Sequence, residues 1–187
     1  MVDMTETIEI DESKVEEIRS VKPKITTADQ THEQLIDLLA KEMEKLLDGV
    51  LSNEDSDEEA KVPFKIYKQF TPFRGSEEDE SPFPYCTIKF DQSKISDVDQ
   101  REEVDILMDF GIYYDKEDRQ YQHIFFHIFN LVRQRFLANN FLDNYRCEPE
   151  MTFALSPEDE VTYPHYFAGI GMKWMIPGIS READFWS

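Results

Sequence analysis

This sequence of 187 residues has no long hydrophobic run, few cysteines and few basic residues. None of its apolar stretches approaches the roughly 18 residues of a membrane helix, and its acidic N-terminus lacks the basic and apolar regions of a signal peptide. We therefore predict no membrane partner, and synthesis in the cytoplasm. The two cysteines, Cys86 and Cys147, lie in strand-like segments. Without an export signal, two buried and reduced thiols are favoured over a disulfide.

Basic residues are scarce: 20 Lys and Arg stand against 40 Asp and Glu, which gives a formal net charge of −20. Proteins that bind nucleic acid gain affinity by neutralising phosphates with Lys and Arg, and this surface would mostly repel phosphates. The charge therefore argues against sequence-specific binding of DNA or RNA. It serves solubility, and it would also suit a surface past which DNA must move without adhering.

Catalytic motifs are missing as well. His123 and His127 are four residues apart, a spacing that could hold a metal, but their pattern HIFFH lacks the glutamate of HExxH. No cysteine or third histidine lies at ligand spacing. Asp105 and Asp109 share the outer face of one predicted strand, where solvated acids are commoner than a catalytic or cation-binding pair. Because GxGxxG, GxSxG and Cys–His motifs are also lacking, we predict no enzyme activity, no cofactor and no metal.

Two strands that each carry one apolar face stand out in the second half of the chain. Their apolar residues recur with a period of two, which is typical of a β-strand lying with one face on a core. The first row is Val104, Ile106, Met108, Phe110, Ile112 and Tyr114, and the second is Tyr166, Ala168, Ile170, Met172, Trp174 and Ile176. Both rows predict strands of one sheet above an apolar interior.

A long amphipathic helix, roughly residues 119–140, is predicted between these strands. One face of it carries Tyr121, Ile124, Phe125, Ile128, Val132 and Phe136. Phe126, Phe129 and Leu137 widen that face. A stripe this wide is expected to be covered on more than one side, by the sheet and by either the first helix or a neighbouring subunit.

The remaining segments complete an α+β pattern. An amphipathic helix begins at Thr31, where Thr31 and Gln34 could form a capping pair. Shorter alternating segments predict strands at 64–70, 85–90 and 147–155, and the polar stretches between them, including 91–101, predict loops. The predicted fold class is α+β, a mainly antiparallel sheet with two helices packed on it. Three parts follow: a flexible acidic arm at 1–30, the α+β domain at 31–178 and a C-terminal tail at 179–187.

Three pairs of residues are candidates for interaction with other chains. Gly169 and Gly171 lie on the outward face of the last predicted strand, where glycine often lets another backbone approach closely. Phe126 and Phe129 are on the widened side of the second helix. The last pair, Phe185 and Trp186, lies near the tip of the C-terminal tail.

Several segments in a set order carry a family resemblance. They are PFPYCTIKF (82–90), VDILMDFGIYY (104–114), YQHIFFHIFNLVRQRFLANN (121–140) and HYFAGIGMKWMIPG (165–178), preceded by the helix HEQLIDLLAKEMEKLL. In this order they resemble the tail terminator, or tail completion, proteins of long-tailed bacteriophages. The resemblance covers about three quarters of the chain and leaves out residues 1–30.

The resemblance implies a structural protein of the virion tail or neck, assembled in the host cytoplasm. Such a subunit closes into a homo-oligomeric ring, usually a hexamer, which caps the tail tube protein and offers a surface to the head connector or neck protein. Six acidic copies would surround the passing genome without holding it. Two other readings stay open: a neck or head-completion protein with the same architecture, and a module that binds a small molecule between sheet and helices.

Overall fold

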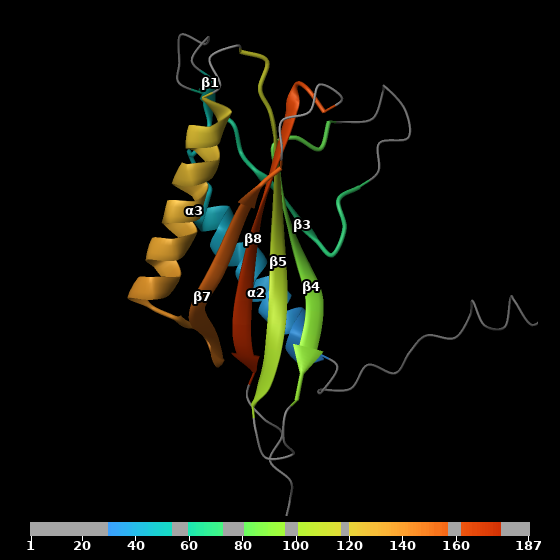
Figure 1. Cartoon of the computed structure of the whole chain (residues 1–187), viewed down its shortest axis with the longest axis vertical. Coiled ribbons are helices and arrows are strands. Elements are labelled where there is room, and N and C mark those ends of the chain that lie inside the picture. The colour runs from blue at the N-terminus through green and yellow to red at the C-terminus, as the bar shows by residue number, and fades with distance from the viewer. Residues whose placement is uncertain are drawn as a thin grey trace, which may run out of the picture. The chain divides into compact units, whose positions relative to one another are not determined.

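The computed structural model describes residues 30–53, 60–72, 81–95, 101–116, 120–156 and 162–176. Within them, helices α2 (Gln30–Leu46) and α3 (Tyr121–Ala138) pack on a six-stranded sheet of order β3-β4-β5-β8-β7-β6 (Figure 1). The predicted α+β class, with two helices on a mainly antiparallel sheet, is confirmed. The arm at 1–30, except for the first residue of α2, and the tail at 179–187 lie outside the described residues.

The sheet is built around its two longest strands. Its members are β3 (Lys65–Lys68), β4 (Tyr85–Lys94), β5 (Glu102–Tyr113), β6 (Phe141–Leu142), β7 (Tyr145–Leu155) and β8 (His165–Ile176). β5 and β8 pair antiparallel along their full 12 residues, from Glu102 opposite Ile176 to Tyr113 opposite His165. Among the described strands of this sheet, β3 and β4 alone pair in parallel. A separate pair, β1 (Ser52–Asn53) and β2 (Ala60–Lys61), is antiparallel.

Both helices cover the same face of the sheet, and Figure 1 shows the other face turned toward the viewer. The covered face carries the predicted apolar rows of β5 and β8, buried from Val104 to Ile112 and from Ala168 to Ile176. α3 reaches this face through the Phe136 ring, which meets the Trp174 ring edge-on at 5.3 Å. The alternation therefore selects which side of each strand enters the core, because burial of apolar surface makes the largest favourable contribution to the free energy of folding.

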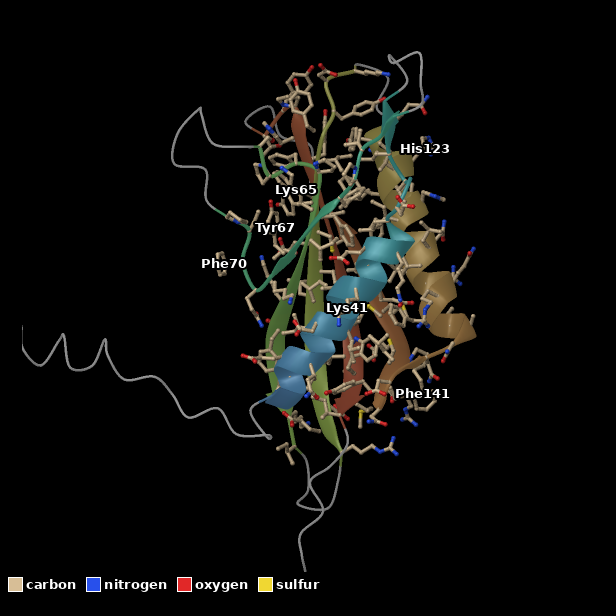
Figure 2. The ribbon with its side chains drawn as sticks, turned by 180° about the vertical axis from the view of Figure 1, so that it is seen from behind. Lys41, Lys65, Tyr67, Phe70, His123 and Phe141 are labelled. Atoms are coloured by element: carbon tan, nitrogen blue, oxygen red, sulfur yellow. The ribbon has the colours of Figure 1, made fainter. Side chains whose placement is uncertain are left out.

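Polar contacts fasten α2 to elements on both of its sides. Toward β3, the Lys68 ammonium binds the Asp37 carboxylate at 2.5 Å. Toward α3, the Arg135 guanidinium pairs with Glu42. The Tyr145 hydroxyl of β7 donates to the Gln34 side chain at 3.4 Å. α2 thus lies across the sheet between β3 and α3, as Figure 2 shows from behind.

Several predicted boundaries are wrong. The strand predicted at 85–90 continues to Lys94, although 91–101 was expected to be a loop, because a bulge between Phe90 and Gln92 breaks the alternation while the pairing with β5 continues. The strand at 64–70 shortens to Lys65–Lys68, since Gln69 has a φ of 67°. α2 starts at Gln30, so Thr31 is not its cap. β8 opens at His165, one residue before the predicted apolar row that starts at Tyr166.

The two cysteines are free and buried, as predicted. Cys86 is on β4 and Cys147 on β7, and the strands β5 and β8 lie between them. Neighbouring strands are about 4.8 Å apart, so the two residues are on the order of 14 Å apart across the sheet, too far for a disulfide. Within the described residues, neither helix has the length and apolar character needed to cross a membrane.

Candidate interaction surfaces

The outer side of α3 is the first candidate surface. Phe126 is 44% exposed and Leu137 is 52% exposed, and Phe141, just beyond the helix, is 50% exposed. Phe126, Arg133 and Leu137 are seven and four residues apart, so they follow one stripe of the helix. His123 and His127 are exposed beside that stripe. We call these six residues the α3 surface, and exposed apolar side chains that follow one stripe make it a candidate interaction site.

The α3 surface also stands out by its charge. Residues 121–142 contain no Asp or Glu, whereas the chain average of 40 acids in 187 residues would place about five there. Arg133 is exposed, while Arg135 is engaged with Glu42 of α2. α3 and the residues that follow it therefore present an apolar and mildly basic surface on a strongly acidic chain.

The two phenylalanines singled out on α3 lie in different environments. The Phe129 ring stacks on the Phe153 ring of β7 at 4.7 Å and is partly buried there. Phe126 is more distant, with 6.0 Å between its ring centre and that of Phe153. Phe126 is thus available to a partner, whereas Phe129 contributes mainly to packing within the subunit.

The uncovered face of the sheet is the second candidate surface. Gly169 lies on it between Asp109 and Ala154, and Gly171 lies between Leu107 and Thr152. A side chain at Gly171 would meet the Thr152 hydroxyl of the same chain at 2.5 Å, which is a reason within the subunit for a small residue. At Gly169 the nearest atom would be 3.8 Å away, so that position has room.

Charged groups on the uncovered face are largely paired. Asp109 binds the Lys89 ammonium, and Asp105 accepts a hydrogen bond from the Gln92 amide at 2.7 Å. Each carboxylate therefore has its own partner, and the two do not share a proton or a cation site. No cluster of three or more potential metal ligands occurs in the part of the chain that the structure describes.

Two hollows also lie on this face. One, of about 350 Å³, is lined by residues that include Tyr85, Asp109 and Phe167. The other, of about 310 Å³, is lined by residues that include Leu107 and Lys173. Both reach the lower end of the size range that small-molecule sites occupy.

Aromatic rings gather at one end of the uncovered face. The Phe83 ring centre is 4.6 Å from that of His165, 5.3 Å from Tyr85 and 6.1 Å from Phe167. Tyr113 adds an edge-on contact with His165 at 5.5 Å. Burial raises the pKa of Tyr85, and the nearby Asp109 carboxylate raises that pKa further. The Tyr85 phenol is therefore neutral at physiological pH.

The aromatic cluster makes Gly111 a sharp test of packing on this face. A Cβ at Gly111 would overlap the Tyr85 ring and come within 2.9 Å of Phe83. We expect Gly111→Ala to lower the free energy of unfolding by roughly 1–3 kcal/mol, because the rings must move. Gly169→Ala is the matched control on the neighbouring strand, and urea titration should find it close to the wild type. Equal effects of the two variants would show that the rings yield freely.

The predicted pairs do not form one surface. Phe126 and Phe129 belong to the helix-covered side, Gly169 and Gly171 lie on the opposite face of the sheet, and the third pair, in the C-terminal tail, lies outside the described residues. Sequence reasoning passed over Phe70, which is 72% exposed at the end of β3, and the exposure of Phe141. The missing acids of 121–142 are the sequence signal that could have drawn attention to Phe141.

Comparisons of this chain with protein-family models and with curated protein sequences give no match. The resemblance of its segments to tail terminators therefore stays a prediction.

Proposed function

We propose that this protein is a tail terminator of a long-tailed bacteriophage, a ring-forming structural protein that caps the tail tube and joins the tail to the head connector. The observation that carries the proposal is the α3 surface. All of it except Phe141 lies within the segment YQHIFFHIFNLVRQRFLANN, which resembles tail terminators, and it keeps Phe126 and Leu137 at the surface. A protein that assembles with other subunits needs such an apolar surface, since a soluble monomer gains nothing from exposing it.

The fold suits a ring subunit. The two helices pack on the apolar face of the sheet. Because that packing fixes the helices and strands relative to one another, it also fixes the positions of the surfaces at the edges of the domain. A ring built by rotation uses two different surfaces of each copy and leaves two unlike axial faces. One axial face would meet the tail tube protein, and the other would meet the head connector or neck protein.

The charge supports the same function. With a formal charge of −20 per chain, six copies would carry about 120 negative charges. A genome that passes through such a ring meets mostly like charge, and it finds few cations from which to release counterions. The ring would let DNA through and would not bind it, in the virion tail or neck.

Two other functions stay open. A neck or head-completion protein would use the same frame and the same α3 surface against a different partner. A small-molecule-binding module is favoured only by the two hollows on the uncovered face, of about 350 and 310 Å³. A binding module of that kind has no need of the α3 surface.

The test is the length of the tail tube. Added to polymerising tail-tube subunits, the protein should stop growth at one ring per tube tip, because the ring occupies the end that the next tube ring would use. Virus that lacks it should show tubes of uncontrolled length, or tails without heads, in electron micrographs. Normal-length tails attached to heads in its absence would reject the terminator and leave the other two candidates.

A DNA-binding assay accompanies the tube experiment. The protein should show no affinity for duplex DNA that rises as the salt concentration falls, since it has little cationic surface. A steep salt dependence would contradict the proposed passive lumen.

A further inference from the structure

We propose that neighbouring copies join head to tail, with the α3 surface of one copy against the β3 edge of the next. By the β3 edge we mean Phe70 at the end of β3, together with Glu33, Asp37 and Glu44 of α2. This inference rests on the proposed ring and deepens it by naming the two surfaces that meet.

The carboxylates of the β3 edge form one stripe on α2. Glu33, Asp37 and Glu44 are exposed and lie four and seven residues apart, so they share one side of the helix, and the exposed Lys41 lies among them on that side. Asp37 shows which side this is, since its carboxylate binds Lys68 of β3 at 2.5 Å. The opposite flank of α2 carries Glu42, which pairs with Arg135 of α3. The acidic stripe therefore borders β3 and lies away from α3.

An apolar group completes the β3 edge. Phe70 is 72% exposed, the largest exposure among the large hydrophobic side chains of the described residues. Its backbone follows Gln69, whose φ of 67° interrupts the extended backbone just after β3. Phe70 follows Lys68, which binds Asp37 of the stripe, so an apolar side chain and the net negative charge of Glu33 and Glu44 suit an apolar surface that carries Arg133.

The α3 surface has that composition. Phe126, Leu137 and Phe141 are each about half exposed, and Arg133 lies on the same stripe as the first two. No Asp or Glu occurs in residues 121–142 to oppose the carboxylates of a neighbour. Charge complementarity of this kind selects the partner surface and its orientation.

The two surfaces are placed for a ring. Figure 2 shows Phe70 at one edge of the domain, beyond β3, and His123 and Phe141 at the other edge, along α3. A contact between two different surfaces repeats from copy to copy and closes if the rotation allows, whereas a contact of α3 with itself would stop at a dimer. Self-contact of α3 would also bring Arg133 near its own copy with no acid on that surface to balance it.

The experiment disables one surface at a time. Phe126→Glu places a carboxylate on the α3 surface, where it would repel the acidic stripe of the neighbouring copy. Phe70→Glu replaces the apolar side chain of the β3 edge by a charged one. Light scattering should give a ring for the wild-type chain and monomers for each variant, because an unpaired charge in an apolar contact is costly. Ile95→Glu, at a position 63% exposed outside both surfaces, is the matched control and should still form rings. Circular dichroism should show the wild-type fold for all three.

Mixing the two disabled variants identifies the geometry. Phe126→Glu keeps its β3 edge and Phe70→Glu keeps its α3 surface, so an equimolar mixture should form 1:1 dimers and nothing larger. Rings formed by either variant alone, or no dimer in the mixture, would overturn the head-to-tail contact while the ring and the proposed function stand. A wild-type chain that stays monomeric at every concentration would reject both proposals.

Discussion

Replacing Phe125 by alanine is expected to lower the free energy of unfolding by roughly 3–5 kcal/mol, the cost of emptying a close-packed aromatic site. Phe125 is 1% exposed and lies on the side of α3 that faces the sheet, with Ile128 and Val132. The loss combines the transfer of the ring to water with the cavity that the neighbours cannot fill. Since domains are stable by about 5–15 kcal/mol, this one change would remove a large part of the total.

The next residue provides the control for Phe125. Phe126→Ala removes the same ring from a position that is 44% exposed, so we expect a loss of about 1 kcal/mol or less. Urea titration followed by circular dichroism measures both variants in the isolated subunit. A change below about 1 kcal/mol for Phe125→Ala would show that this side of α3 is not packed on the sheet.

Raising the pH from 9 to 10 is expected to destabilise the fold by about 2 kcal/mol through its two buried thiols. Burial, with a smaller contribution from the Glu148 carboxylate, raises the pKa of Cys147 to about 12. The pKa of Cys86 is raised by burial and, to a smaller extent, by Asp109. The unfolded chain releases both protons from about pH 9 while the folded chain retains them, so stability present below pH 9 is lost above it. Each thiol contributes roughly 1 kcal/mol over that interval.

The measurement is the free energy of unfolding at pH 8, 9 and 10. The matched variant carries Cys86→Ala and Cys147→Ala; whatever its stability at pH 8, its curve should be flatter between pH 9 and 10. The interval ends at pH 10 because Tyr85 and Tyr145, whose pKa values are also raised by burial, contribute above it. Parallel curves for the variant and the wild type would mean that the thiols reach solvent in the folded protein.

The sequence predicted the frame well where the pattern is local. The alternating rows of β5 and β8 and the helical spacing of α3 depend on residues two to four positions apart, so each row indicates both the element and its buried face. The positions of Asp105, Asp109, Gly169 and Gly171 on the outward face follow from the same alternation. The α+β class follows from the order of these elements.

The predicted strand boundaries were wrong where the backbone departs from regular extended geometry. The bulge after Phe90 shifts the alternation by one residue, so the polar end of β4 does not read as a strand, although it pairs with β5. Gln69 ends β3 early through a backbone conformation that no apolar pattern encodes. The two-residue strands β1, β2 and β6 are too short to display a period at all.

By itself, then, the sequence determined an acidic α+β domain, the faces that its long strands and second helix bury, and two buried thiols. The tertiary structure alone decided which apolar side chains stay at the surface. Phe126 and Phe129 both widen the apolar side of α3 in the sequence pattern. Their exposure differs because Phe153, from a strand more than 20 residues away, stacks on Phe129. Lys68, two residues before Phe70, binds Asp37 of α2 across 31 residues. Such contacts depend on the packing of distant segments, which no local period can report.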